Sequence, residues 1–146
     1  MNPILEYWGG IQSGRFTVSK RVEKLYQKLA DEIQHPKGRY HYDEARANRP
    51  IEFIERFCKH SKGEWAGKPV ALELFQKAFI AALFGFVDGK TGLRKYREAL
   101  FLVGRKNGKS TMAAGIALYC MIADGEPGAE IYSTATKYAQ AKLLFD

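Results

Sequence analysis

A short basic segment that follows residue 103 carries the residue types that bind phosphate. An apolar run, Ala99 to Val103, leads into a loop that ends in Gly108-Lys109-Ser110 and opens a helical pattern. A loop that opens a helix points unpaired backbone N–H groups at one spot, and the helix dipole adds positive potential there. Gly108 lets the backbone approach a phosphate, Lys109 can reach the β- and γ-phosphates, and the Ser110 hydroxyl can bind Mg²⁺.

The match to the usual phosphate-loop pattern is incomplete. The pattern G-x-x-x-x-G-K-[ST] needs glycine at position 103, where this chain has Val103, and Gly104 comes one place late. The context supports the motif, because a strand-like run precedes the loop and a pattern rich in Ala, Met, Ile and Leu, Thr111 to Ile122, follows it. An ordinary basic turn between a strand and a helix stays open as the alternative.

The composition is that of a globular domain. The chain has 146 residues, of which 46% are hydrophobic and 27% charged. No apolar run approaches the roughly 20 residues that span a bilayer, and the first residues lack the pattern of a signal peptide. Cys58 and Cys120 fit no metal-ligand spacing, so we expect buried free thiols in a reducing compartment.

The charge balance is basic. The net charge is +7, with 23 Lys and Arg against 16 Asp and Glu. This excess favours a polyanion partner such as nucleic acid. The basic residues are spread along the whole chain, so a basic protein without such a partner stays open.

The first half of the chain reads as helical after an irregular start. Three glycines before residue 15 predict an irregular segment over residues 1–17, in which Tyr7 is a packing anchor. Ser19 is placed to cap a helix that runs to about Gln34, with one apolar face formed by Val22, Leu25, Tyr26, Leu29 and Ile33. Asp43 is placed to cap a second helix, which we expect Pro50 to interrupt.

The second half alternates helices and strands. The predicted elements are a helix over 72–86, a turn over 88–92, a strand over 96–103, a helix over 109–123, a strand over 129–134 and a last helix from 137. The turn and the first strand can form a hairpin or simply the entry to the sheet. Strand–loop–helix–strand predicts a parallel sheet with a right-handed crossover, hence an α/β fold.

Two strands are too few for such a sheet. We therefore expect the sequence to be the front piece of a longer α/β domain, with a helical N-terminal region over 1–70 and the first part of the sheet domain over 71–146. A small α+β domain that closes by oligomerising is the alternative.

The sequence resembles the large terminase subunit of tailed double-stranded DNA bacteriophages, over nearly its whole length. The resemblance is carried by the loop and by several flanking segments: 50–55, 63–67, 74–76, 103–111, 113–119, 124–128 and 135–141. Loops of this family often lack the first glycine and contain a basic residue, as this one does. The resemblance implies a P-loop NTPase sheet, here incomplete, and the ATP-binding portion of a DNA-packaging motor.

The resemblance also implies site residues. ATP would be bound by the loop and the start of its helix: Gly104, Arg105, Lys106, Asn107, Gly108, Lys109, Ser110 and Thr111. Ser110 would hold Mg²⁺, and Arg105 would stabilise charge near the γ-phosphate. Gln76 would read adenine, with Phe75 beside it, or else be a polar residue on a helix surface. Residues 133–136 would match a helicase-like motif, and a helix N-cap is the simpler reading of the same residues.

Hydrolysis needs acidic residues that this chain does not supply. We read Asp124 as part of a helix stop, so the acidic strand motif that holds Mg²⁺ is missing, as are the carboxylates of the family's nuclease. The chain alone is therefore not expected to be a working motor or nuclease. The alternatives are another P-loop enzyme, such as a helicase-like ATPase or a kinase, or a truncated partner-binding module that docks through helices 19–34 and 43–60.

The family also implies partners for the complete protein. They are double-stranded DNA, the small terminase subunit and the portal protein, with a homo-oligomeric ring and no membrane. The implied location is the host-cell cytoplasm.

Overall fold

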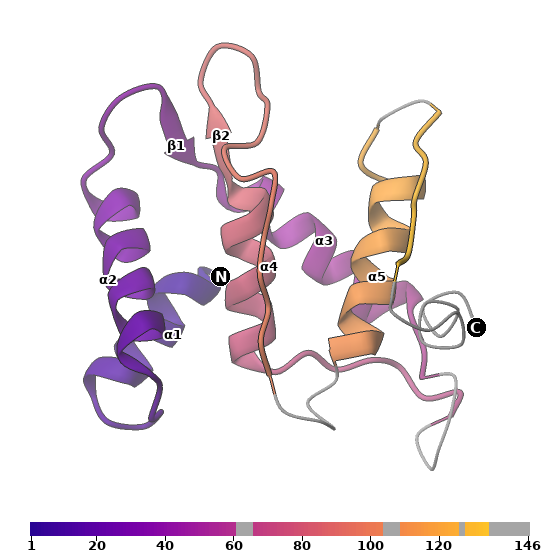
Figure 1. Ribbon diagram of the computed structural model, residues 1–146, viewed down its shortest axis with the longest axis horizontal. Coiled ribbons are helices and arrows are strands. Elements are labelled where there is room, and N and C mark those ends of the chain that lie inside the picture. The colour runs from indigo at the N-terminus through magenta and orange to yellow at the C-terminus, as the bar shows by residue number, and fades with distance from the viewer. Residues whose placement is uncertain (61–65, 104–108, 126–127, 135–146) are drawn as a thin grey trace. The chain divides into compact units, whose positions relative to one another are not determined.

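The computed structural model describes residues 1–60, 66–103, 109–125 and 128–134 (Figure 1). Within these residues the fold is mixed α/β, with helices that outnumber two short strands. The elements are α1 (Pro3–Gln12), α2 (Lys20–Gln34), β1 (Tyr40–Tyr42), α3 (Glu44–Phe57), α4 (Leu74–Gly85), β2 (Phe86–Asp88) and α5 (Lys109–Ile122). None of these helices is long and apolar enough to cross a membrane.

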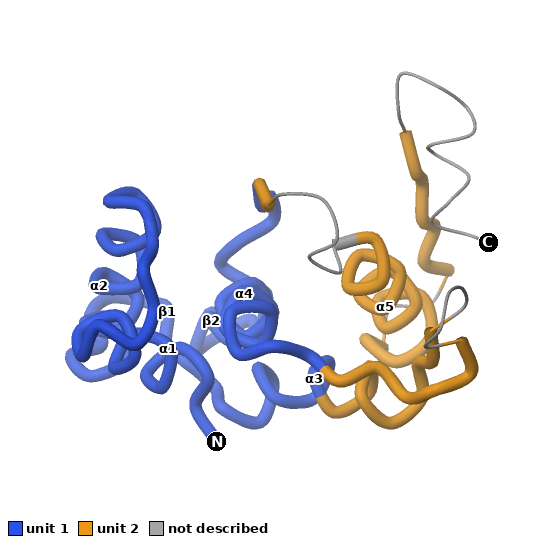
Figure 2. Tube along the Cα trace, turned by 90° about the horizontal axis from the view of Figure 1, so that it is seen from below, with its two compact units in different colours: residues 1–51, 72–100 blue, residues 52–71, 101–146 orange. Residues whose placement is uncertain are grey.

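The chain folds into two compact units that interleave along the sequence (Figure 2). Unit 1 consists of Met1–Ile51 and Leu72–Leu100, and unit 2 of Glu52–Ala71 and Phe101–Asp146. Unit 1 contains α1, α2, both strands, α4 and the first half of α3. Unit 2 contains the second half of α3 and α5. The predicted boundary at residue 70 stays a prediction.

Helix α1 occupies a segment that we expected to be irregular, so that prediction is wrong. The Leu5 backbone N–H donates to Asn2 Oδ1 at 3.2 Å, and Pro3 fits the first helical position. Ile4 and Tyr7 are buried in unit 1. Burial of such side chains is worth about 1.5–3 kcal/mol each, which exceeds the roughly 1 kcal/mol that a helical glycine costs.

Helix α2 confirms its prediction closely. The Val22 backbone N–H donates to Ser19 Oγ at 3.3 Å, so Ser19 is the N-cap. Tyr26 and Leu29 are buried, whereas Leu25, which we placed on the same apolar face, is 47% exposed. The buried side of α2 is therefore narrower than the sequence pattern indicated.

Helix α3 begins as predicted but is not interrupted. The Arg46 backbone N–H donates to Asp43 Oδ1 at 3.2 Å, which confirms Asp43 as the cap. Pro50 lies inside one continuous helix, so the predicted break is wrong. Proline removes one helical hydrogen bond, but Pro50, Ile51 and Ile54 are all fully buried, and this packing offsets the loss.

The sheet is a two-stranded antiparallel ribbon, β1 with β2, in which His41 is opposite Val87. After the predicted turn, the Lys95 backbone N–H donates to the Phe86 carbonyl at 2.8 Å, and Val87 pairs with Arg94. The turn is thus confirmed, and it closes a short hairpin rather than entering a parallel sheet.

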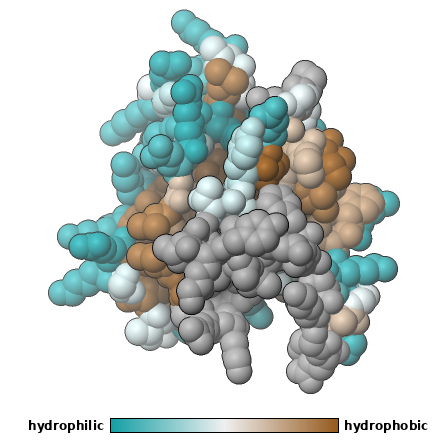
Figure 3. All heavy atoms as spheres, turned by 45° about the vertical axis from the view of Figure 1, so that its right-hand side comes forward, coloured by the Kyte–Doolittle hydropathy of each residue, from teal (hydrophilic) through white to brown (hydrophobic). Residues whose placement is uncertain are grey.

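Two predicted strands are not present in the structure. Residues 96–103 and 129–134 have no strand assignment, and Leu100 and Leu102 are 79% and 82% exposed. A strand without a neighbour has no ladder for its backbone hydrogen bonds, so neither segment forms one by itself. Figure 3 shows hydrophobic side chains at the surface in this view. The predicted last helix lies outside the described residues.

Candidate nucleotide site

The described part of the predicted phosphate site is the first turn of α5. Lys109, Ser110 and Thr111 are its first three residues, as predicted. Ser110 is exposed and Thr111 is half-buried, while Met112 is buried, with 2% exposure. The loop that precedes them, with Gly104, Arg105, Lys106, Asn107 and Gly108, lies outside the described residues.

Close packing within unit 2 fixes α5. A Cβ atom at Gly115 would lie 2.9 Å from Ile54 Cγ1, so the backbone of α5 runs directly against α3. One turn further on, the Tyr119 and Phe53 rings meet with centroids 5.5 Å apart. The sequence favours this arrangement, because glycine among small residues in a helix allows close approach. The second half of α3 therefore positions the helix that carries Lys109 and Ser110.

Helix α5 ends where the sequence predicted. The backbone N–H groups of Ala123 and Asp124 both donate to the Tyr119 carbonyl, at 2.8 and 3.0 Å. Asp124 follows the helix end and does not lie on a strand. This confirms the reading of Asp124 as a helix stop.

Gln76 lies in the first turn of α4, in unit 1, and is 6% exposed. Its Oε1 accepts a hydrogen bond from the Glu73 backbone N–H at 2.9 Å, and the Glu73 side chain accepts one from the Gln76 backbone. This reciprocal pair is a capping box that closes the start of α4. Phe75, beside it, is half-buried.

The capping role of Gln76 was missed in the sequence. Glu73 and Gln76 are three residues apart just before an apolar run, and this spacing is the signal that could have revealed it. The alternative of a polar residue on the helix surface is wrong, because Gln76 is buried. The adenine role stays a prediction.

Unit 1 also holds a buried acid, Asp88, whose oxygens are engaged. Oδ1 accepts from the backbone N–H of Lys90 at 2.8 Å, and Oδ2 accepts from Arg39 Nε at 2.8 Å. The Lys90 N–H and then the Arg39 side chain hold the pKa of Asp88 below its usual range. Asp88 therefore fixes the hairpin turn as a carboxylate.

Cys58 and Cys120 form no disulfide and are half-buried, in partial agreement with the prediction of buried thiols. Burial raises the pKa of Cys58, which favours the protonated thiol. Ser133 is half-buried in a segment without regular structure, and the remainder of the predicted helicase-like motif, after residue 134, lies outside the described residues.

Comparison with known proteins identifies the class of protein. Residues 74–146 match the family described as terminase large subunit, ATPase domain. This match covers half of the chain. The chain therefore belongs to the terminase large subunit family, a family of phage DNA-packaging motors.

A particular relative is the terminase large subunit of Enterobacteria phage HK97. The two sequences are 36% identical over 102 residues, which are 69% of this chain and 19% of the relative. The chain thus spans about a fifth of the length of the curated relative that it matches. No solved structure matches the chain.

Proposed function

We propose that this chain is the ATP-binding N-terminal portion of a viral DNA-packaging motor, which couples ATP hydrolysis to DNA translocation in the complete protein. One observation carries the proposal. The motif Gly108-Lys109-Ser110 coincides with the start of α5, where backbone N–H groups and the helix dipole favour a phosphate. Membership of the terminase large subunit family supports it.

In this proposal the loop residues 104–108 and the first turn of α5 surround the phosphates. Lys109 neutralises the β- and γ-phosphates, and Ser110, which is exposed, places its hydroxyl on Mg²⁺. Arg105 stabilises the charge that develops on the γ-phosphate. Attack of water in line with the leaving group then depends on positioning and charge neutralisation, with an acidic residue supplied by the remainder of the motor.

Gln76 reads the adenine edge in this proposal, with Phe75 beside it. Its amide can accept from the adenine amino group and donate to a ring nitrogen. The capping box supports the role, because it holds Oε1 at a fixed place in the first turn of α4. Rigid positioning of a reading group lowers the entropy cost of binding.

The complete motor would add the remaining sheet. We propose that residues 96–103 and 129–134 become parallel strands of a P-loop NTPase sheet once neighbouring strands are present. The exposure of Leu100 and Leu102 supports this, because apolar side chains at the surface gain by being covered. The proposed partners are double-stranded DNA, the small terminase subunit, the portal protein and further copies in a ring, in the host-cell cytoplasm.

The test is a titration of the chain with a fluorescent ATP analogue and Mg²⁺. We expect saturable binding that weakens roughly 10- to 100-fold in Lys109→Ala, because a hydrogen bond to a charged group contributes about 1.5–3 kcal/mol. The matched control is Lys59→Ala, which removes an exposed lysine elsewhere in unit 2.

Equal weakening in both lysine variants would contradict a specific role for Lys109. Absence of binding in a folded sample would contradict a preformed site in this chain, and the same titration on a longer chain that continues past residue 146 would then show whether downstream strands complete it. Retained partner binding without any nucleotide affinity in the longer chain would favour a non-catalytic docking module.

A further inference from the structure

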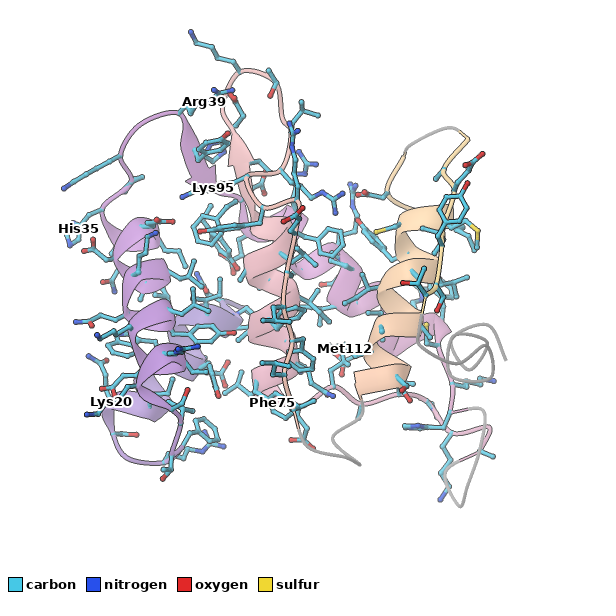
Figure 4. All side chains as sticks on the ribbon, in the orientation of Figure 1. Lys20, His35, Arg39, Phe75, Lys95 and Met112 are labelled. Carbon is cyan, nitrogen blue, oxygen red and sulfur yellow. The ribbon has the colours of Figure 1, made fainter. Side chains whose placement is uncertain are left out.

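Helix α2 carries a row of basic side chains on the side away from its core contacts. Lys20, Lys24 and Lys28 are spaced four residues apart, so they lie on one face, and Arg21 lies beside them. All four are exposed, whereas the opposite side of α2 buries Tyr26, Leu29 and Ala30. Figure 4 shows Lys20 at the outer edge of α2. We call these four residues the α2 basic face.

Three other basic residues of unit 1 make polar contacts within the fold. Arg39 pairs with Asp88 at 2.5 Å, Lys95 pairs with Glu32 at 3.3 Å, and an Arg46 side-chain N–H donates to the Gly92 carbonyl. In contrast, no side chain of the α2 basic face makes a hydrogen bond or ion pair with another described residue. Their charges are therefore available to a partner.

Part of this charge is unfavourable to α2. Lys20 and Arg21 lie in the first turn, where the helix dipole disfavours positive charge, and only Glu23 compensates there. Lys24 is four residues from both Lys20 and Lys28, and like charges at this spacing repel. An external anion would relieve both effects.

We propose that the α2 basic face binds the phosphate backbone of double-stranded DNA. The inference rests on the proposed function, which makes duplex DNA the substrate of the motor, and it assigns a surface to that substrate. Lysines four residues apart are about 6 Å apart along the helix axis, so their flexible side chains can follow a row of phosphates. Contacts to phosphates carry no sequence information, so binding should be independent of sequence and strongly salt-dependent.

The experiment measures binding of the chain to a fluorescent DNA duplex at a series of salt concentrations. The variant is Lys20→Gln, Lys24→Gln and Lys28→Gln together, since glutamine keeps helix propensity and removes charge. The control is Lys37→Gln, Lys59→Gln and Lys90→Gln together, which removes the same charge from exposed sites outside α2. Circular dichroism verifies that both variants fold.

The expected result is that the slope of log affinity against log salt becomes shallower by roughly 2 to 3 in the α2 variant, about one per lost phosphate contact, and changes little in the control. Equal changes in both variants, or a chain that does not bind the duplex, would overturn the proposal. Binding of anionic lipid vesicles through α2, without binding of the duplex, would also overturn the proposal. ATP titration of the same variants is a separate readout, so a failed phosphate loop and a failed DNA surface are told apart.

Discussion

At the start of α4, Gln76 Oε1 accepts a hydrogen bond from the Glu73 backbone N–H, and the Glu73 side chain accepts one from the Gln76 backbone N–H. The first turn of α4 is therefore capped by its own side chains. At the start of α5, Ser110 is exposed, and the helix follows a loop of glycine and basic residues. Both turns contain residues that the terminase resemblance assigns to ATP. The first turn of α4 has a structural function of its own, whereas in the first turn of α5 the Ser110 side chain is exposed and Thr111 is half-buried.

This contrast means that the two predicted ATP contacts should respond differently to substitution. A change in α4 should alter the free energy of unfolding as well as any nucleotide affinity. A change at Lys109 or Ser110 should alter affinity alone. Within unit 1, the expected effects of substitution on stability decrease from Gly85 through Gln76 to Asp88.

The largest effect on stability is expected at the other end of α4. A Cβ atom at Gly85 would lie 2.5 Å from Tyr42 Cε2 and 2.8 Å from the Ala47 Cβ atom. We therefore expect Gly85→Ala to destabilise the fold by about 1–3 kcal/mol in urea unfolding, despite the better helix propensity of alanine.

Gly9→Ala is the matched control for that substitution. Gly9 lies inside α1, and nothing is within 4 Å of a Cβ atom built there. Alanine should stabilise this site by about 0.5–1 kcal/mol. A loss of stability in Gly9→Ala, or none in Gly85→Ala, would contradict the packing described for unit 1.

The capping box gives the next prediction. Gln76→Ala should destabilise the fold by about 0.5–2 kcal/mol because it removes one half of the reciprocal cap. It should also weaken the binding of ATP more than the binding of tripolyphosphate if Gln76 reads adenine. Fluorescence titration with both ligands and chemical unfolding measure the two effects.

The substitution Gln76→Glu separates the capping role of this residue from its proposed adenine role. Glutamate keeps the acceptor that the cap needs but lacks the amide N–H donors. Adenine reading would be supported if the variant is about as stable as the wild type, binds ATP more weakly and binds tripolyphosphate with unchanged affinity. An equal loss of affinity for ATP and for tripolyphosphate would contradict adenine reading.

Asp88 gives the smallest effect, and it depends on pH. Its folded pKa is lowered, first by the Lys90 backbone N–H and then by Arg39, so the carboxylate form stabilises the fold. This contribution is complete above the unfolded pKa of about 3.9 and is lost as the pH falls through the lower folded value. The wild type should therefore be more stable than Asp88→Asn at pH 7, and the difference should shrink below pH 4. Unfolding at several pH values measures it, and a constant difference would contradict the assignment.

Local signals in the sequence were sufficient for several elements. The caps of α2 and α3 and the extent of α5 could be predicted because Ser19, Asp43 and the Asp124 stop act within one turn. Helix α1 was missed because its glycines were weighed without the Asn2 cap and the burial of Ile4, which depends on distant parts of unit 1.

Long-range pairing explains the other failures. The runs at 96–103 and 129–134 have strand-like composition, but strands need partners, and among the described residues only β1 and β2 form a two-stranded ladder. In the candidate site, the motif located the first turn of α5 correctly. The capping role of Gln76 was not found, because the spacing to Glu73 that reveals it was not considered.

The most direct test of the contrast between α4 and α5 is thermal unfolding of the wild type and Lys109→Ala, each with and without saturating Mg²⁺ and ATP. A ligand that binds only the folded state raises its stability, by about 2.7 kcal/mol at 100 times the dissociation constant. We predict equal melting temperatures without nucleotide and an increase with nucleotide in the wild type alone. A lower melting temperature of the variant without nucleotide, or the same increase in both proteins, would contradict the assignment of Lys109 to ATP.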